Sequence, residues 1–294
     1  GLVALALAWG AVGAIGLTLL VDLLLSLAID PRSPLRGDAF TSVVQAPIVE
    51  ELFKGLGVFL IFVFARRAFD GPVDGIVYGA LVGAGFAFTE NIQYFAVSMI
   101  EGGVEQATAT FFVRGILSPF AHVMFTSVTG FALGLAARRG YGPAAALGPG
   151  LIGLAGAVAL HALWNGSAVF GDFFALYVTV QVPFFVAFIL GVLALRREEA
   201  RLTRARLGDY AAAGWFAPQE VDTLATGPGR RSALAWARTL PGDRTRVMRA
   251  FILDATRLAA ARQRAISGRD PIAFEMEREL LARTAQARAT LFAP

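Results

Sequence analysis

Long apolar stretches fill the first 195 residues of this 294-residue chain. A helix needs about 20 mostly apolar residues to cross the roughly 30 Å hydrocarbon core of a bilayer. The segments that are long enough cover approximately residues 3–29, 42–65, 74–99, 111–137, 146–170 and 173–195. The composition, 56% hydrophobic and 16% charged, also departs from that of soluble domains. The chain is therefore predicted to be an all-α, polytopic membrane helical bundle with at least six transmembrane helices.

The balance of charge changes near Arg196. Residues 1–195 carry 8 basic and 11 acidic side chains, whereas residues 196–294 carry 18 arginines and 11 acids. This change predicts two parts, a transmembrane bundle over 1–195 and an arginine-rich cytosolic helical tail over 196–294. The tail's 11 acids are interleaved with its arginines, and no basic and aromatic face is present, which argues against nucleic-acid binding.

Helix signals divide the tail further. Residues 196–213 read as a helix leaving the membrane, and its five arginines suit anionic lipid head groups. A second helix is expected from Asp243 to about Ile266, and Gly268 would end it. A third would run from Asp270 and Pro271 to about Leu291, which predicts a helical hairpin.

The arginines near the segment ends predict an orientation. Pairs follow the second, fourth and sixth segments, and the charged residues of the loop 101–110 are all acidic. The positive-inside rule then places the N-terminus and the tail in the cytoplasm, with the loops near 30–40, 100–110 and 171–173 outside. The helix count is a minimum, because the sequence begins with Gly rather than Met.

Charged residues interrupt the second apolar segment, "APIVEELFKGLG" over residues 46–57. Charges at membrane depth are costly and mark functional sites by default. Counting residues from each helix's predicted outer end places rare polar side chains roughly 13 to 17 Å below the outer surface. These residues are Glu50, Glu90, His122 and His161, and they include both histidines of the chain. We therefore expect four helices to bring them together.

Stripes of small residues support this convergence. Gly75, Gly79 and Gly83 recur every four residues and lead to Glu90 on roughly the same helix face. A second stripe consists of Gly153, Ala157, His161 and Asn165. Close helix packing at such stripes would turn the polar groups into the bundle.

Two carboxylates, two imidazoles and an amide at one buried depth suit hydrolysis. A buried glutamate can take a proton from water, and imidazoles can bind a metal or donate to a developing oxyanion. Asn165, one turn after His161, could be a second oxyanion donor. Lys54, four residues after Glu50, could pair with it and leave Glu51 to titrate.

Each of these residues also has a purely structural interpretation. Glu50 and Lys54 could form a self-neutralised pair, or Pro47 could start the helix and leave both glutamates near the interface. Either histidine alone is more often a packing residue than a catalyst. Glu90 could bond Tyr94 or nearby backbone.

Two charged residues belong to neither interpretation of the site. Asp22 is expected to have a partner on a helix, and Arg114 is expected to snorkel toward the outer surface.

Four ordered motifs resemble the PrsW intramembrane proteases, distant relatives of the CAAX prenyl endopeptidases and of the γ-secretase scaffold subunit. They are "EELFK" (50–54), "DGIVYGALVGAGFAFTEN" (74–91), "SPFAH" (118–122) and "HALWN" (161–165). The resemblance covers about residues 40–195. It implies a multi-pass endopeptidase that makes a first cut in a membrane-anchored substrate, typically an anti-sigma factor in an envelope-stress response.

The resemblance also implies residue roles. Glu50 and Glu51 would be the catalytic pair, with His122, His161 and Asn165 in the site and with Lys54, Glu90 and Asn91 supporting it. His122, His161 and Glu90 could hold zinc, with Glu50 or Glu51 as the base. The chain has no HExxH motif, and the related endopeptidases are glutamate-dependent without an obligatory metal. We therefore prefer a metal-free glutamate mechanism and keep zinc as the alternative.

Other functions compete with the protease. A non-catalytic membrane scaffold or chaperone could use the same bundle, and a proton-coupled transporter could use the acids as a relay. The sequence has no visible two-fold repeat, which argues against the transporter. A scaffold needs no water activator, so the glutamates and histidines favour the protease. The oligomeric state is left open.

Overall fold

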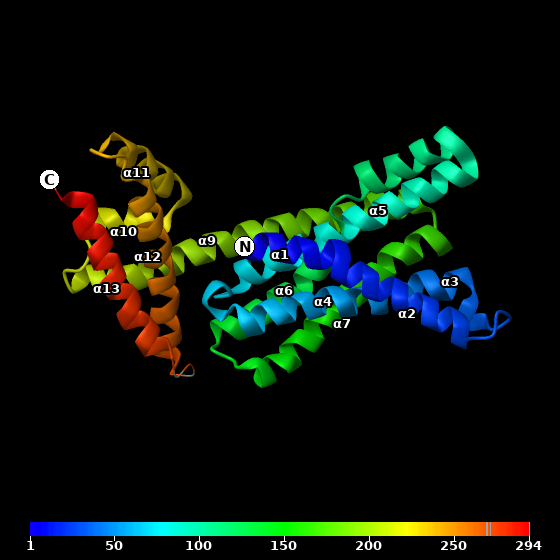
Figure 1. Ribbon diagram of the computed structural model, residues 1–294, viewed down its shortest axis with the longest axis horizontal. Coiled ribbons are helices and arrows are strands. Elements are labelled where there is room, and N and C mark those ends of the chain that lie inside the picture. Colours follow the sequence, from blue (N-terminus) through cyan, green and yellow to red (C-terminus); the bar gives the residue numbers. More distant parts are fainter. Residues whose placement is uncertain (269, 271, 294) are drawn as a thin grey trace. The chain divides into compact units, whose positions relative to one another are not determined.

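The computed structural model describes residues 1–268, 270 and 272–293, and every regular element in this part of the chain is a helix (Figure 1). The all-α expectation is therefore confirmed. Contacts divide the chain into two compact units. The first comprises residues 1–137 and 142–191, and the second comprises residues 138–141 and 192–294.

The first unit contains the apolar helices. Short π-helical and 3-10 segments, labelled η, join or extend several of them. In chain order the elements are α1 (Leu2–Ala8), η1 (Trp9–Ala14), α2 (Ile15–Ala28), η2 (Pro34–Arg36), α3 (Asp38–Phe40), η3 (Thr41–Gln45), α4 (Ala46–Phe64), η4 (Arg66–Ala68), α5 (Pro72–Phe111), η5 (Phe112–Leu117), α6 (Ala121–Arg138), α7 (Pro143–Phe170), α8 (Phe173–Leu176) and η6 (Tyr177–Gln181). Helix α9 (Val182–Ala212) follows.

Four helical stretches of the described chain are long and apolar enough to cross a membrane: Leu2–Ala28, Pro72–Arg138, Pro143–Phe170 and Phe173–Ala212. The expected count of at least six is thus not confirmed, for two physical reasons. The segment 42–65 contains Glu50, Glu51 and Lys54, which lower its apolar character. The third and fourth expected segments both lie within the single stretch Pro72–Arg138.

That stretch is a hairpin, because the chain reverses at Gly103 (Figure 1). Gly103 has a φ of 64° and a ψ of −156°, a conformation that glycine adopts without steric cost. The hydroxyl groups of Ser98 and Thr110 lie 2.7 Å apart across the two arms. The expected loop over 101–110 is therefore mostly helical, and the two arms extend beyond the predicted apolar segments.

Glycines allow α5 and α6 to approach closely. A Cβ added at Gly75 would overlap the backbone carbonyl of Gly130, and one at Gly83 would overlap that of His122. At Gly79 it would lie 2.7 Å from the carbonyl oxygen of Thr126. The glycine stripe predicted from the sequence thus receives the backbone of α6 and positions His122 beside α5.

The start of α4 rejects one alternative interpretation. Gln45, which precedes α4, has helical dihedral angles, and helical turns run through α3 and η3 from Asp38. Pro47 therefore does not begin an isolated helix. Glu50 is 7% exposed and Glu51 is fully buried, so both glutamates lie inside the bundle.

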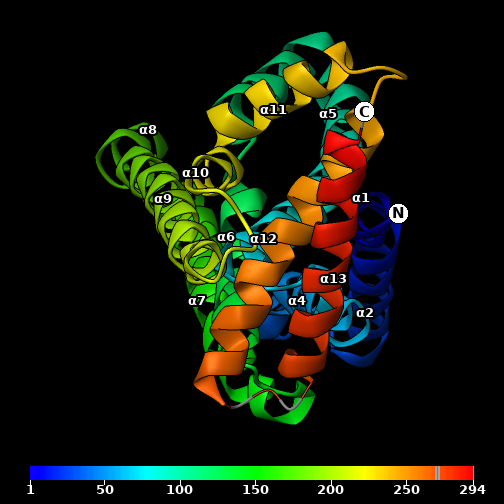
Figure 2. The same ribbon diagram turned by 90° about the vertical axis from the view of Figure 1, so that its left-hand side faces the viewer.

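The second unit is a small helical module with its own core. Its elements after α9 are α10 (Pro218–Ala225), α11 (Gly227–Thr239), α12 (Thr245–Ser267) and α13 (Ala273–Phe292). Helices α12 and α13 lie side by side (Figure 2). Gly268 ends α12 in the left-handed conformation, with a φ of 67°, as the sequence predicted. Pro271, the expected start of the next helix, lies outside the described residues.

The core of this module is apolar, and ion pairs such as Arg283–Asp254 and Arg264–Asp270 add to it. Arg283 donates two hydrogen bonds of 3.0 and 2.9 Å to Asp254, which is 3% exposed. Helices α10 and α11 were not predicted from the sequence. A signal was present, because the Glu220 carboxylate accepts a 2.6 Å hydrogen bond from the backbone N–H of Ala217, as a capping residue does at the third helical position.

We expect the substitution Gly75→Leu to disrupt the first unit. The added side chain would collide with the backbone of α6, at a cost of about 3 kcal/mol or more. Gly16→Leu in α2 is the matched control, because nothing lies within 4 Å of its Cβ position. Thermal unfolding in detergent should show a clear loss for Gly75→Leu alone, and equal midpoints would contradict this packing.

Candidate active site

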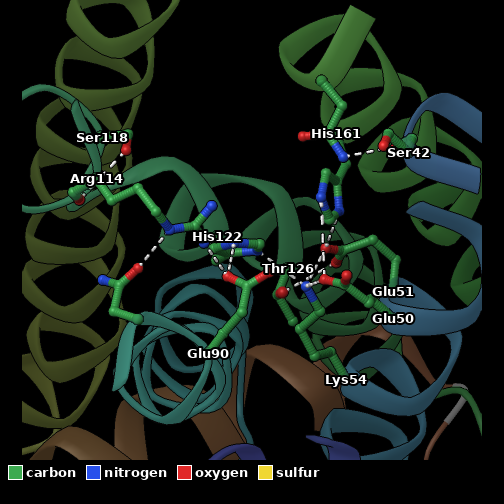
Figure 3. A network of polar contacts seen from close by, with 12 residues as sticks. Ser42, Glu50, Glu51, Lys54, Glu90, Arg114, Ser118, His122, Thr126 and His161 are labelled. Carbon is green, nitrogen blue, oxygen red and sulfur yellow. Dashed lines mark hydrogen bonds and ion pairs between the residues drawn. The ribbon is translucent and has the colours of Figure 1, made fainter. Parts of the chain in front are cut away.

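Lys54 lies at the centre of a buried polar cluster and is fully buried itself (Figure 3). Its Nζ lies 2.6 Å from Glu51 Oε1, 3.2 Å from Glu50 Oε2 and 3.0 Å from His122 Nδ1. These three acceptors match the three N–H bonds of an ammonium group. The Phe86 ring, 4.2 Å away, adds a cation–π contact. The simple Glu50–Lys54 pair considered from the sequence is thus part of a larger network.

Both carboxylate oxygens of Glu51 have hydrogen-bond partners. Besides Lys54, it accepts a 3.0 Å hydrogen bond from the Thr126 hydroxyl and contacts His161 Nδ1 at 3.1 Å. A carboxylate only accepts, so this contact places the proton of neutral His161 on Nδ1. The lone pair of His161 Nε2 is then free. Glu51 therefore orients His161, rather than standing apart to titrate as the sequence analysis expected.

Glu50 has a different environment. Its Oε2 lies 3.9 Å from His161 Nε2, and both residues line a cavity of about 360 Å³. Glu51 and Lys54 do not line this cavity. Adjacent helical positions are about 100° apart, so Glu50 faces the cavity while Glu51 faces the packed interior. Of the two adjacent glutamates, Glu50 is the one that can meet a water molecule or a substrate.

The two histidines pack against each other and against Phe125. The ring centroids of His122 and His161 are 5.0 Å apart, and Phe125 stacks on His161 at 5.0 Å. Nδ1 of His122 accepts from Lys54, so its Nε2 carries the proton and donates to Glu90 at 2.9 Å. Packing and hydrogen bonds thus fix both rings at one wall of the cavity.

Glu90 bridges His122 and Arg114 (Figure 3). Arg114 pairs with Glu90, donates to Asn91 Oδ1 at 2.8 Å and lies 3.7 Å from the centroid of the Tyr94 ring. The sequence predicted that Arg114 would snorkel toward the outer surface. Instead, its side chain contacts Glu90, Asn91 and Tyr94. The cost of an arginine at membrane depth is the signal that could have assigned it to the site.

Asn165 contributes to the architecture of the cavity. Its Nδ2 donates a 2.7 Å hydrogen bond to the backbone carbonyl of Ser42 in η3. One N–H of the amide is thus used to join α7 to η3, and the other remains. Asn165 also lines the cavity, so the role of oxyanion donor stays open for that second N–H.

The structure brings together the residues that the depth count selected. The cavity is lined by Glu50, Glu90, His122 and His161. Lys54 does not line the cavity but contacts Glu50 and His122. Thr126, which holds Glu51, was missed because an isolated threonine in a glycine-rich helix gives no sequence signal.

The possible metal ligands differ from the expected set. Glu50, His122 and His161 offer ligand atoms that all lie within 4.8 Å of one another. Glu90 belongs to no such group among the described residues, because Arg114 and His122 engage its carboxylate. Two imidazoles and one carboxylate form a donor set typical of catalytic zinc. Tetrahedral zinc would separate ligand atoms by roughly 3.3 Å, so ligation requires the three side chains to close slightly. His122 must also release the Nδ1 lone pair that accepts from Lys54, while its Nε2–H keeps the bond to Glu90.

A buried acid and histidine cluster beside a cavity, inside a unit built from long apolar helices, defines a multi-pass membrane protein with a site of the composition that hydrolases use. The sequence matches the family described as PrsW family intramembrane metalloprotease over residues 1–190, and the chain belongs to this family.

Curated relatives are similar over shorter regions. Protease PrsW of Bacillus subtilis (strain 168) is 40% identical over 100 residues, and Protease PrsW of Geobacillus kaustophilus (strain HTA426) is 39% identical over 98 residues. These matches cover 34% and 33% of this chain, and 42% and 40% of the relatives. The chain thus spans about two fifths of the length of these relatives. No solved structure matches the chain.

We expect Glu51→Ala to destabilise the bundle more than Glu50→Ala. Removing Glu51 takes away the shortest Lys54 contact and leaves Glu50, at 3.2 Å, as the one carboxylate beside the buried ammonium. Breaking a buried ion pair by removing one partner costs about 3 to 5 kcal/mol. Glu50 is at the cavity wall, where water can replace part of its interactions. The midpoints of thermal unfolding in detergent measure the difference.

The double variant Glu51→Ala with Lys54→Met serves as the control. Because it also removes the ammonium that has lost its shortest ion pair, it should recover part of the lost stability. Equal losses for the two single variants, or no recovery in the double variant, would contradict the assignment of Glu51 as the internal partner.

Proposed function

We propose that this chain is an intramembrane endopeptidase that hydrolyses a peptide bond at the cavity bounded by Glu50, His122 and His161. The observation that carries the proposal is the 3.9 Å approach of Glu50 Oε2 to the free Nε2 of His161 on the cavity wall. An acceptor carboxylate and an imidazole at this distance can flank one water molecule. The description of the family as a protease favours this function over a scaffold or a transporter.

The chain's own residues divide the chemical work. Glu50 takes the proton from the attacking water and later returns it to the leaving nitrogen, as a general base and acid does. Lys54 stabilises the Glu50 carboxylate in the low dielectric of the bundle. Glu51 keeps the Nδ1 tautomer of His161, and Glu90 holds His122. Remaining N–H groups of Arg114 and Asn165, which line the cavity, are available for the carbonyl oxygen.

A divalent metal ion is part of the proposal. The metal-free mechanism preferred from the sequence disagrees with the family's description as metalloproteases, and Glu50, His122 and His161 have the right ligand types. Zinc held by these residues would supply Lewis-acid activation of water and of the scissile carbonyl. Glu50 would then use one carboxylate oxygen as a ligand and keep the other to take the proton from water. The bond between Glu51 and His161 Nδ1 is the second contact that metal-binding histidines usually make.

The substrate we propose is a membrane-anchored protein of the anti-sigma-factor kind in an envelope-stress pathway. Its scissile segment must unwind before cleavage, because helical carbonyls are hydrogen-bonded and shielded. With both termini in the cytoplasm, the site lies in the outer half of the bilayer. The cut would then fall near the outer end of the substrate's transmembrane helix.

The second unit is proposed to lie in the cytosol as a separate domain after about residue 195. The arginines of α9 and of the helices that follow would contact anionic head groups at the inner leaflet. Residues 196–294 carry the 18 arginines counted above. Their positive charge favours binding to the anionic inner leaflet.

We expect Glu50→Gln to reduce cleavage by about two to four orders of magnitude, because an amide cannot take the proton from water. The purified chain would be reconstituted with single-pass candidate substrates, and the termini of the products would be mapped by mass spectrometry. The exposed Glu105 provides a matched control, and Glu105→Gln should retain the rate.

Two results would count against this function. Cleavage by a folded Glu50→Gln variant at the wild-type rate would refute the role of Glu50 as the base. Products cut at the cytoplasmic end of the substrate helix would refute the proposed orientation or depth of the site.

Metal content gives a separate prediction. Wild-type protein should bind about one divalent ion per chain, and His161→Ala or Glu50→Ala should lose it, because three-ligand sites depend on every ligand. Glu90→Gln should bind more weakly, by roughly 10- to 100-fold, yet still fill at saturating metal. Elemental analysis after equilibration with zinc measures this. Stoichiometric metal in His161→Ala, or its loss from Glu90→Gln at saturation, would contradict the proposed ligand set.

A further inference from the structure

Asp22 is an acidic side chain that the catalytic cluster does not use. It is the one charged residue in the apolar helical run Leu2–Ala28. Its carboxylate accepts a 2.9 Å hydrogen bond from the amide of Gln45 in η3. Within the described chain no cationic side chain pairs with Asp22. The partner expected from the sequence therefore exists, but it is neutral and leaves the charge uncompensated.

The environment of Asp22 is part of the cavity that also holds Glu50 and His161. Thr18 lies one turn earlier on the same face of α2 and lines the same cavity. Its side chain is 5% exposed, and its hydroxyl has no hydrogen-bond partner among the described residues. A buried hydroxyl without a partner is costly, so this end of the cavity has polar groups available for a ligand.

The cavity lining around Arg114 is different. There the charge of Arg114 is matched by Glu90, and its remaining contacts are Asn91 and Tyr94. The cavity lining therefore includes a region around Arg114 whose charges are paired and a region on α2 and η3 that carries an unpaired negative charge.

We propose that Asp22, with Thr18 and Gln45, forms a specificity subsite that binds a lysine or arginine side chain of the unwound substrate segment. The inference rests on the proposed protease function, since the same cavity would hold the scissile bond. Ile15 and Leu19 also line this end, and they can cover the methylene stem of a long basic side chain. An acid in a weakly polar surrounding binds a cation strongly, because water screens the pair little. A basic residue at a fixed distance from the scissile bond would then be selected.

The test uses the full chain in proteoliposomes with single-pass peptides that carry Lys, Gln or Glu in turn at each position around the outer helix end. We expect one position at which Lys is cleaved about tenfold or more faster than Gln. Asp22→Asn should bring this ratio close to one, and Asp22→Lys should favour Glu at the same position. Asp30→Asn is the matched control, because Asp30 is exposed in the loop after α2. Equal unfolding midpoints would show that the variants are folded.

A binding measurement separates this proposal from the proposed function. The affinities of the Lys and Gln peptides are compared for Glu50→Gln protein with and without Asp22→Asn, so no turnover is needed. A Lys preference that Asp22→Asn abolishes supports the subsite even if wild-type protein cleaves none of the peptides, a result that would count against the protease alone. Cleavage or binding without a charge preference at any position, or with a preference that Asp22→Asn leaves unchanged, would overturn the subsite. A proton-relay role for Asp22 would give that outcome.

Discussion

The buried ammonium of Lys54 is the interaction on which the site depends. A fully buried ammonium is costly unless each of its N–H groups has an acceptor, and three acceptors surround this one at 2.6 to 3.2 Å. Two of them are on α4 and the third, His122, is on α6. Lys54 therefore fixes both the conformation of the glutamate pair and the distance between two helices.

The glycine stripe of α5 makes that distance possible. Side chains larger than hydrogen at Gly79 or Gly83 would meet the backbone of α6 around Thr126 and His122. Close contact brings His122 within reach of both Lys54 and Glu90, which belong to different helices. The packing surface and the polar site therefore depend on each other. The turns of α6 that pack against Gly79 and Gly83 are also the turns that carry Thr126 and His122.

Much of this arrangement could be predicted from the sequence. Apolar segment lengths predicted a helical bundle, and equal depths along four helices predicted that Glu50, Glu90, His122 and His161 would meet. Depth is a coordinate along the membrane normal that residue counting provides directly. Residue counting does not provide the rotation of each helix about its axis. The contact of Arg114 with Glu90 and that of Asn165 with η3 were therefore not predictable.

The same limit explains the ligand set. Counting placed Glu90 and Glu50 at similar depth, and both line the cavity. Only the side-chain contacts show that Arg114 and His122 engage Glu90, whereas Glu50 has an oxygen near both histidines. The expected count of at least six transmembrane helices is not confirmed, since the second segment carries three charges and the third and fourth join in one stretch that reverses at Gly103.

The two adjacent glutamates show how one sequence feature can serve two physical tasks. Neighbouring helical residues point about 100° apart, so a pair of acids cannot share one environment. Glu51 is fully buried and accepts from Lys54, Thr126 and His161, whereas Glu50 is 7% exposed on the cavity wall. The first has no free lone pair directed at a substrate, and the second has no comparable cage to hold it. A reactive carboxylate at membrane depth needs a fixed cation and a fixed imidazole nearby, and Glu51 holds both in place for Glu50.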